Sequence, residues 1–220
     1  MAQPSNVTEP PLVSVIGPQF VVSYEFKVII DRHSGGSLVI TDADNKILFT
    51  LKSCDSSLHF QWLLRDANDT PIALLRKKNI SLHNRWNVYK GESNNGQDII
   101  FSIASNHTIQ SKTHLKVSLA NITRGRDDCD FTIKGEWSKK NCKIYMGDSS
   151  TVIAQMDKMK PPANKDKFMV TINPMMDYAF VVSLIAIVHA MDIHRKAGNK
   201  AAAEGTAEGV AAVFGALFSG

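Results

Sequence analysis

Hydrophobic and polar residues alternate along most of the chain between residues 21 and 172. Segments such as 47–52, 99–103, 114–119 and 168–172 place an apolar residue at every second position. Because successive side chains of a β-strand point to opposite faces, each segment is typical of a strand with one apolar face. We expect about ten to twelve such strands in this span.

Short polar segments separate these runs and predict tight turns. Residues 42–46, 66–70 and 147–150 are rich in Asp, Asn, Gly and Ser, and each lies between two apolar runs. Asp and Asn tolerate the left-handed backbone and accept hydrogen bonds from nearby main-chain amides, which tight reversals need. The chain therefore predicts consecutive antiparallel hairpins.

The alternation ends at Asn173 and Pro174, which suit the cap and first position of a helix. Residues 175–191 are apolar with no polar face, and Arg195, Lys196 and Gly198 suit a helix end. A helix that is apolar on all sides must be surrounded by lipid or by protein. The apolar stretch from Tyr178 to Met191 spans only about 21 Å, against roughly 30 Å of hydrocarbon in a bilayer.

We therefore favour a helix buried in protein over a transmembrane segment. A closed β-barrel that surrounds the helix satisfies both the apolar strand faces and the apolar helix. The expected organisation is an extended, proline-rich arm at residues 1–19, one domain at residues 20–196 and a low-complexity Ala/Gly-rich tail at residues 197–220.

Composition narrows the classes of partner and compartment. The chain has 25 Lys and Arg against 21 Asp and Glu, a formal net charge of +4. This is a mild preference for anionic partners, below what direct nucleic-acid binding requires. The N-terminus lacks the pattern of a secretory signal, so we expect a cytoplasmic protein, with peripheral plasma-membrane and nuclear positions as alternatives. The three cysteines are then expected to be reduced and buried.

Motifs for catalysis and for metal or cofactor binding do not emerge. The Asp-rich segments at 42–46 and 66–70 lack the glycine and the terminal glutamate of a calcium loop. The seven histidines and three cysteines lack zinc-ligand spacing, and neither a nucleophile elbow nor a phosphate-binding glycine loop is present. We therefore expect a protein that is not an enzyme and that holds no metal and no cofactor.

Basic clusters are the remaining candidate site. They are Arg76, Lys77 and Lys78; Lys139 and Lys140; and Lys158 and Lys160. Such residues are commonly solvated strand ends. Gathered on one rim of a barrel, they would instead hold an anionic phospholipid or phosphoinositide head group, each adding roughly 1 kcal/mol near an anionic surface.

Several segments resemble the plant LURP-one-related family. They include residues 76–91, 130–137, 142–145, 152–156 and 168–180. The most specific are the string with Ser81, Leu82, His83, Arg85 and Trp86, which runs on to Gly91, and the later Asp-Tyr-Ala at 177–179. The resemblance extends over roughly residues 20 to 195.

This resemblance implies a tubby-like fold, related to the phospholipid scramblases, in which twelve strands surround one hydrophobic C-terminal helix. It also implies a relation to membrane-tethered transcription factors and a role in plant defence signalling, with no catalytic residue to assign. Our main hypothesis is a non-enzymatic protein that binds an anionic lipid or a protein partner. The alternatives are a scramblase-like lipid-handling membrane protein and a protein-interaction module without a ligand.

Overall fold

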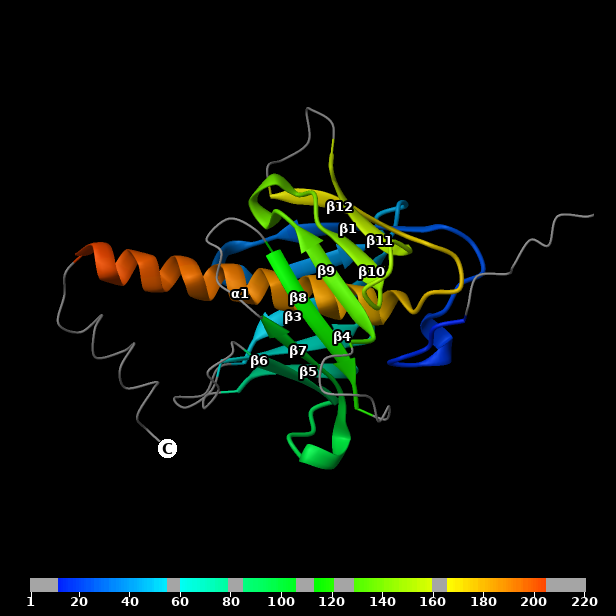
Figure 1. Cartoon of the computed structure of the whole chain (residues 1–220), viewed down its shortest axis with the longest axis horizontal. Coiled ribbons are helices and arrows are strands. Elements are labelled where there is room, and N and C mark those ends of the chain that lie inside the picture. The colour runs from blue at the N-terminus through cyan, green and yellow to red at the C-terminus, as the bar shows by residue number, and fades with distance from the viewer. Residues whose placement is uncertain are drawn as a thin grey trace, which may run out of the picture.

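Twelve antiparallel strands form a closed barrel in the computed structural model, which describes residues 12–54, 60–78, 85–105, 113–120, 129–159 and 166–204 (Figure 1). Each strand pairs with the next in the chain, and β1 pairs with β12 to close the barrel. The strands are β1 (Phe26–Arg32), β2 (Leu38–Thr41), β3 (Ile47–Ser53), β4 (Gln61–Asp66), β5 (Pro71–Lys77), β6 (Arg85–Lys90), β7 (Ile99–Ser105), β8 (Thr113–Leu119), β9 (Phe131–Gly135), β10 (Lys143–Met146), β11 (Val152–Lys158) and β12 (Lys167–Ile172). The expected barrel and its hairpins are confirmed.

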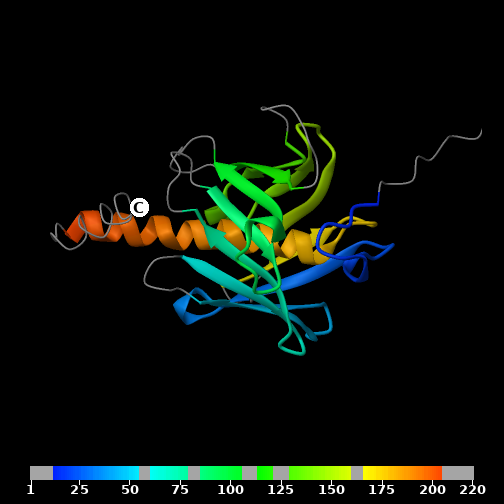
Figure 2. The same cartoon turned by 90° about the horizontal axis from the view of Figure 1, so that it is seen from below.

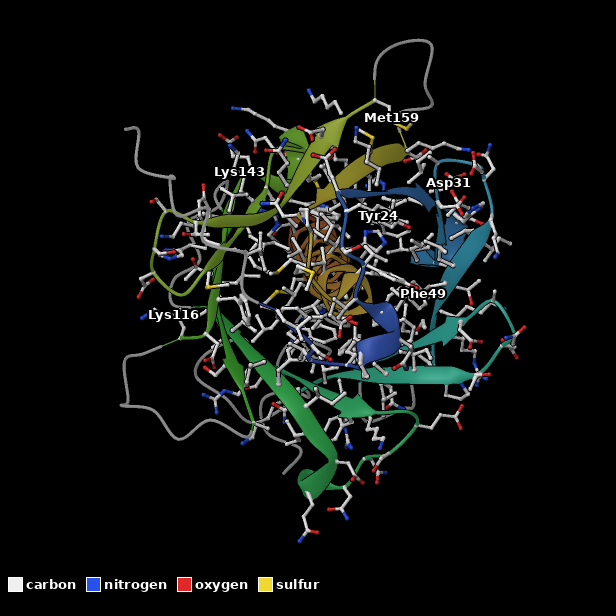
Figure 3. All side chains as sticks on the ribbon, turned by 90° about the vertical axis from the view of Figure 1, so that its right-hand side faces the viewer. Tyr24, Asp31, Phe49, Lys116, Lys143 and Met159 are labelled. Atoms are coloured by element: carbon white, nitrogen blue, oxygen red, sulfur yellow. The ribbon has the colours of Figure 1, made fainter. Side chains whose placement is uncertain are left out.

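A long helix, α1 (Tyr178–Glu204), passes through the middle of this barrel. Seen end-on, the strands form a ring around the helix (Figure 3). Its residues from Ala179 to Ala190 are buried, and Phe180 packs between Phe101 and Phe131 at ring distances of 5.1 and 5.0 Å. Each fully buried large apolar side chain contributes roughly 1.5–3 kcal/mol, so the helix is the centre of the hydrophobic core.

The ends of the helix differ from the sequence-based prediction. The helix begins at Tyr178 and not after Asn173, because Met175 takes a left-handed conformation (φ 64°) that turns the chain before the helix. The helix also continues past Gly198 to Glu204, where alanines with high helix propensity follow. Residues 197–204 of the predicted tail are therefore helical, whereas residues 205–220 lie outside the described residues.

The length argument against a membrane span was consequently wrong, although its conclusion about burial is confirmed. Residues Tyr178–Asn199 form a helix that is long and apolar enough to cross a bilayer by length and composition alone. However, 72% of its most apolar stretch is buried inside the protein. Burial in the barrel, and not length, accounts for the apolar character of this helix.

The segment before β1 is tied to the start of the helix. The main-chain amides of Val15, Ile16 and Gly17 all donate to Oδ2 of Asp177, at 3.0, 2.7 and 3.1 Å. The other oxygen of this fully buried carboxylate accepts from the amide of Phe180 at 2.9 Å and caps the helix. Residues 12–19 of the predicted arm are thus held against the domain, and residues 1–11 lie outside the described residues.

The barrel has two unlike rims. The rim where α1 begins, here called the start rim, carries the turns that follow even-numbered strands. The rim where α1 leaves the barrel, here called the exit rim, carries the turns that follow odd-numbered strands. In Figures 1 and 2 the helix projects well beyond the exit rim.

A histidine and two tryptophans close the barrel at the exit rim. His189 Nε2 lies 2.9 Å from the carbonyl oxygen of Gly36 in the turn between β1 and β2. The His189 ring also contacts Trp62 and Trp137, at 6.3 and 5.9 Å between ring centroids. Gly36 has φ +80°, and a Cβ at this position would approach the Ile193 side chain to 2.5 Å, so the close approach of turn and helix requires glycine.

We predict that Asp177→Ala lowers the free energy of unfolding by about 3 kcal/mol, because four main-chain amides lose their acceptor in a buried position. Asp177→Asn should cost less, since it keeps one acceptor oxygen. Chemical denaturation monitored by tryptophan fluorescence measures both changes. The matched control is Asp44→Ala at an exposed turn, which should change the stability by less than about 0.5 kcal/mol. Equal losses in the two alanine variants would contradict the role given to Asp177.

Candidate functional site

The described members of all three predicted basic clusters lie at the exit rim. Arg76 and Lys77 end β5 and Lys78 follows them, while Lys158 ends β11. Lys139 and Lys140 lie in the turn after β9, where the short 3-10 helix η4 (Trp137–Lys139) is found. Because β5, β9 and β11 are all odd-numbered strands of one antiparallel barrel, their ends share a rim. Lys160 lies outside the described residues.

The emerging helix separates these clusters into two groups. On one side, the Lys77 ammonium contacts Nε2 of His194 on α1. On the other side, Lys140 lies near Asp192 and Lys196 of the same helix, whose charges influence its pKa. The structure therefore brings the clusters to one rim but does not bring them into one pocket.

Charge is distributed unequally between the two rims. Among the described residues, the acidic side chains in the turns and adjoining strand ends of the start rim include Asp42, Asp44, Asp66, Asp69, Glu92, Asp98 and Asp148, accompanied by Lys46, Arg65 and Lys90. The described basic residues at the exit rim, in its turns, at the adjoining strand ends and on the helix, include Arg32, Arg76, Lys77, Lys78, Arg85, Lys139, Lys140, Lys143, Lys158, Lys167, Arg195 and Lys196, accompanied by Asp31, Glu136, Asp166 and Asp192. The charges of the described residues are thus unevenly distributed along the barrel axis.

Turn formation explains much of the acidic rim. Asp42 Oδ1 accepts from the amides of Asp44 and Lys46, both at 2.9 Å, and shapes the turn between β2 and β3. Asp66 Oδ1 accepts from Asn68 and Thr70 at 2.9 and 2.8 Å in the turn between β4 and β5. These aspartates are required by the tight reversals of the backbone.

The basic rim has no comparable structural explanation. Within the part of the chain that the structure describes, Lys78, Lys140 and Lys158 form no ion pair, and Lys78 and Lys158 are exposed. Other basic residues of this rim are paired: Lys139 with Glu136 at 2.9 Å, Arg32 with Asp166 at 2.7 Å and Lys167 with Asp31 at 3.1 Å. Arg195 and Lys196 both bind Asp192. Unpaired cations on a rim repel one another, so a stability requirement does not account for their presence.

Lys77 and His194 form a half-buried pair on one side of the helix. The ammonium of Lys77 lies 5.7 Å from the centre of the Phe60 ring, and Phe60 is 41% exposed. Burial lowers the pKa of Lys77, and burial together with the charge of Lys77 lowers the pKa of His194. This side presents an aromatic ring beside a cation to solvent.

Lys140 occupies a more unusual position on the other side. Its ammonium lies 4.4 Å from the centre of the Trp137 ring and 4.7 Å from that of Phe168. Burial, followed by the positive charge of Arg32, lowers the pKa of Lys140 from 10.5 to about 8. Asp192 counters this effect only in part, because its carboxylate binds Arg195 at 2.7 Å and Lys196 at 2.8 Å.

Two further residues of this side were missed by the sequence analysis. Trp137 and His189 are each only 4% exposed, and burial lowers the pKa of His189 from 6.5 to about 4. The imidazole is therefore neutral at physiological pH, and its Nε2 carries the hydrogen that Gly36 accepts. The sequence could have placed Trp137 at this rim, because odd-numbered strands of a closed meander all end at the same rim. That inference required the closed barrel to be assumed first.

The remaining sequence-based expectations have mixed outcomes. Cys129 and Cys142 are buried free thiols, as expected. The expectation for Cys54 was wrong, since it is exposed at the end of β3. Among the described residues, no group of three or more His, Cys, Asp or Glu side chains is arranged to hold a metal ion.

We predict that acidification destabilises the protein through His189. The pKa of this group is lower in the folded chain than its ordinary value, so the unfolded chain binds more protons between pH 6.5 and about 4. The free energy of unfolding should therefore fall by about 3 kcal/mol across this window. His189→Gln, which keeps a donor for Gly36, should lose less stability over the same pH range in denaturation experiments. Parallel pH profiles of the two proteins would contradict this prediction.

We predict that Lys140 titrates near pH 8 and that, among the described lysines, its pKa is lowered furthest. Carbon-13 NMR of the reductively methylated protein measures the titration of each lysine, and Lys140→Gln identifies the relevant signal. The adjacent variant Lys139→Gln should leave that signal in place. A Lys140 signal that titrates above pH 10 would show that burial and Arg32 do not act on it as described.

Comparison with known proteins places the chain in a family. The family model described as LURP-one-related matches residues 27–189. Among curated proteins of Arabidopsis thaliana, LURP-one-related 15 is 34% identical over 83% of this chain and 86% of its own length. Protein LURP1 is 38% identical over 70% of this chain and 75% of its own length.

A solved structure agrees with this assignment. An X-ray structure of an Arabidopsis thaliana protein superposes with a TM-score of 0.66 and 31% sequence identity, over 81% of this chain and 98% of that one. The family model spans the barrel from β1 to the buried part of α1, which includes Trp137, Lys140 and His189. On these grounds, the chain belongs to the LURP-one-related family.

Proposed function

We propose that this chain is a non-enzymatic binding protein that attaches to anionic membrane surfaces through its exit rim. The observation that carries the proposal is the axial separation of charge, with unpaired lysines at one rim and acidic turns at the other. Because the acidic turns have a role in the backbone reversals and the lysines do not, the basic rim is the surface that calls for a functional explanation.

The energetics favour a weak, oriented and salt-sensitive attachment. Each Lys or Arg close to an anionic membrane contributes roughly 1 kcal/mol, and this attraction falls off within about 8 Å at physiological ionic strength. Lysines on one flank of the rim therefore supply a few kcal/mol together. The acidic start rim is repelled by the same surface, so the barrel approaches with its exit rim first.

The projecting part of α1 restricts how the rim meets a surface. From Asp192, its last buried residue, to Glu204, the helix extends by roughly 18 Å at about 1.5 Å per residue. A flat bilayer placed across the whole rim would collide with this helix. The contact that we propose is therefore one flank of the rim, with the projecting helix lying beside the membrane surface.

Family membership supports a finer proposal about biological role. The resemblance to the tubby-like and phospholipid scramblase superfamily suggests a membrane-tethered regulator whose release serves as a signal in plant defence. A cytoplasmic protein held peripherally at the plasma membrane, and free to enter the nucleus once detached, fits electrostatic attachment. Lower surface charge or higher salt would then release it without any catalytic step.

A protein-interaction module is the second candidate, and one observation favours it. The projecting helix beyond Asp192 offers a polar stalk beside a basic rim, which suits an acidic protein partner as well as a membrane. By contrast, burial of the apolar half of α1 gives the scramblase-like alternative little support, because the segment that would enter lipid already fills the barrel.

We predict that the full chain binds vesicles containing phosphatidylserine at low salt, and that charge reversal at the exit rim weakens this binding. The double variant Lys143→Glu and Lys158→Glu, which reverses two exposed lysines on the neighbouring strands β10 and β11 of one flank, should bind at least about tenfold more weakly in vesicle sedimentation. The matched control reverses the same number of charges at the start rim, with Lys46→Glu and Lys90→Glu, and should bind nearly as well as the parent chain.

Two results would contradict the proposal. Equal losses in both double variants would mean that overall charge, and not the exit rim, governs binding. Sedimentation that does not depend on anionic lipid would argue against membrane attachment, and stable capture of an acidic protein by the exit rim would then favour the interaction module.

A further inference from the structure

Three buried nitrogen atoms without a hydrogen-bond partner gather beside Lys140. They are Nε of Arg32, Nε1 of Trp137 and Nδ1 of His189, and only one other such side-chain atom occurs among the described residues, Nε1 of Trp86 in the barrel wall. Buried polar atoms of side chains are normally paired, because leaving them unpaired is costly. A local concentration of unpaired atoms is therefore evidence of a binding group that completes the set.

These atoms belong to one corner of the molecule, where η4, the end of β1 and the helix α1 meet. The centroids of the Trp137 and His189 rings are 5.9 Å apart, and the Lys140 ammonium lies 4.4 Å from the Trp137 ring centre. The charge of Arg32 acts on both Lys140 and His189, which places its guanidinium near them. We call this set of four residues the Lys140 corner.

The backbone of Lys140 gives a second, independent indication. Lys140 ends η4 in a left-handed conformation, with φ 54° and ψ 49°. Glycine and asparagine occupy such positions with less strain than lysine does. A strained residue that also carries an unpaired, half-buried charge is typical of a binding site.

The available groups define the ligand chemistry. Arg32 Nε and Trp137 Nε1 are both N–H donors, and the Lys140 ammonium adds further donors and a positive charge. Among the described residues, Asp192 is the carboxylate whose charge acts on Lys140, and it is already bound to Arg195 and Lys196. A second carboxylate, that of Asp166, accepts from Nη2 of Arg32 at 2.7 Å, which leaves Nε as the unpaired donor of this guanidinium. An anion with several acceptor oxygens can accept hydrogen bonds from these donors and also balance the positive charge, which a neutral group cannot do. A phosphate monoester offers three such oxygens with nearly two negative charges.

We propose that the Lys140 corner binds the phosphate monoester of a membrane lipid head group or of a soluble phosphate ester. The inference rests on the proposed membrane function, since it names the group on the membrane that the exit rim recognises. Lys140 supplies the central charge, with Arg32 and Trp137 donating to the phosphate oxygens. His189 Nδ1, an acceptor in the neutral imidazole, takes the hydrogen of a bridging water or of a singly protonated phosphate.

Proton uptake gives this site a distinctive signature. The groups whose charges act on Lys140 are Arg32 of β1, Asp192 and Lys196 of α1, and Cys142 of the turn before β10. A bound phosphate adds negative charge beside Lys140 and raises the pKa of its ammonium. Near pH 8, where the free lysine is partly deprotonated, binding should therefore be accompanied by uptake of a proton.

The test uses the full chain with inositol trisphosphate, and with vesicles that contain either phosphatidylserine or phosphatidylinositol bisphosphate at equal total charge. Isothermal titration in two buffers of different ionisation enthalpy measures affinity and proton uptake. Lys140→Gln should lose at least about tenfold in affinity for inositol trisphosphate, along with the proton uptake. The neighbouring Lys139→Gln removes the same charge from the same turn and should lose less than about threefold.

Two more variants separate binding from folding. Lys140→Arg keeps the charge and should retain most of the affinity. Lys140→Gly removes the side chain without left-handed strain, and it should fold normally and still lose binding. Equal losses for Lys139→Gln and Lys140→Gln would overturn the site.

The inositol trisphosphate titration and the vesicle experiment together distinguish this inference from the proposed function. Vesicle binding without any preference for phosphatidylinositol bisphosphate, and without binding of inositol trisphosphate, would overturn the site and leave membrane attachment in place. Lys140-dependent binding of inositol trisphosphate without vesicle binding would support the site, assign it to a soluble phosphate ester and overturn the membrane proposal. If the protein binds neither inositol trisphosphate nor anionic vesicles, both the phosphate site and the membrane proposal are overturned.

Discussion

A helix with no polar face governs the architecture of this protein. From Ala179 to Ala190 the side chains of α1 are buried on every side, and an open sheet covers only one side of a helix. Closure of the strands into a barrel is therefore the arrangement that satisfies both components. Closure in turn assigns every odd-numbered strand end to the rim where the helix emerges, so the position of each basic cluster follows from the burial of the helix.

The two rims illustrate how a fold separates charge without a large net charge. Tight turns between neighbouring strands favour aspartate because its carboxylate accepts main-chain hydrogen bonds, as Asp42 and Asp66 do. These turns all fall at the start rim. The turns of the exit rim are shaped by other contacts, such as that between Gly36 and His189, which leaves their surface positions free to carry lysine.

Much of the fold could be predicted from the sequence, whereas the site could be predicted only as a set of residues. Strict alternation identified the strands, and the lack of a polar face identified the buried helix. The helix boundaries were misplaced, because Asp177 acts through tertiary hydrogen bonds to Val15, Ile16 and Gly17 and outweighs the local signal of Asn173 and Pro174. Lys139 and Lys140 looked equivalent in sequence, and only the three-dimensional surroundings separate an ion-paired surface lysine from one held over Trp137 and Phe168.

The place of α1 in the chain has a consequence for how the protein is made. All twelve strands leave the ribosome before the helix that fills them, and β1 must wait for β12 before the cylinder can be sealed. During synthesis, the strands therefore expose apolar faces that the helix does not yet cover. Such a state is prone to aggregation and is bound by chaperones. The contacts of β1 with β12 have a high sequence separation, so folding should be slow and cooperative, and the nascent barrel depends on a helix that is translated after all twelve strands.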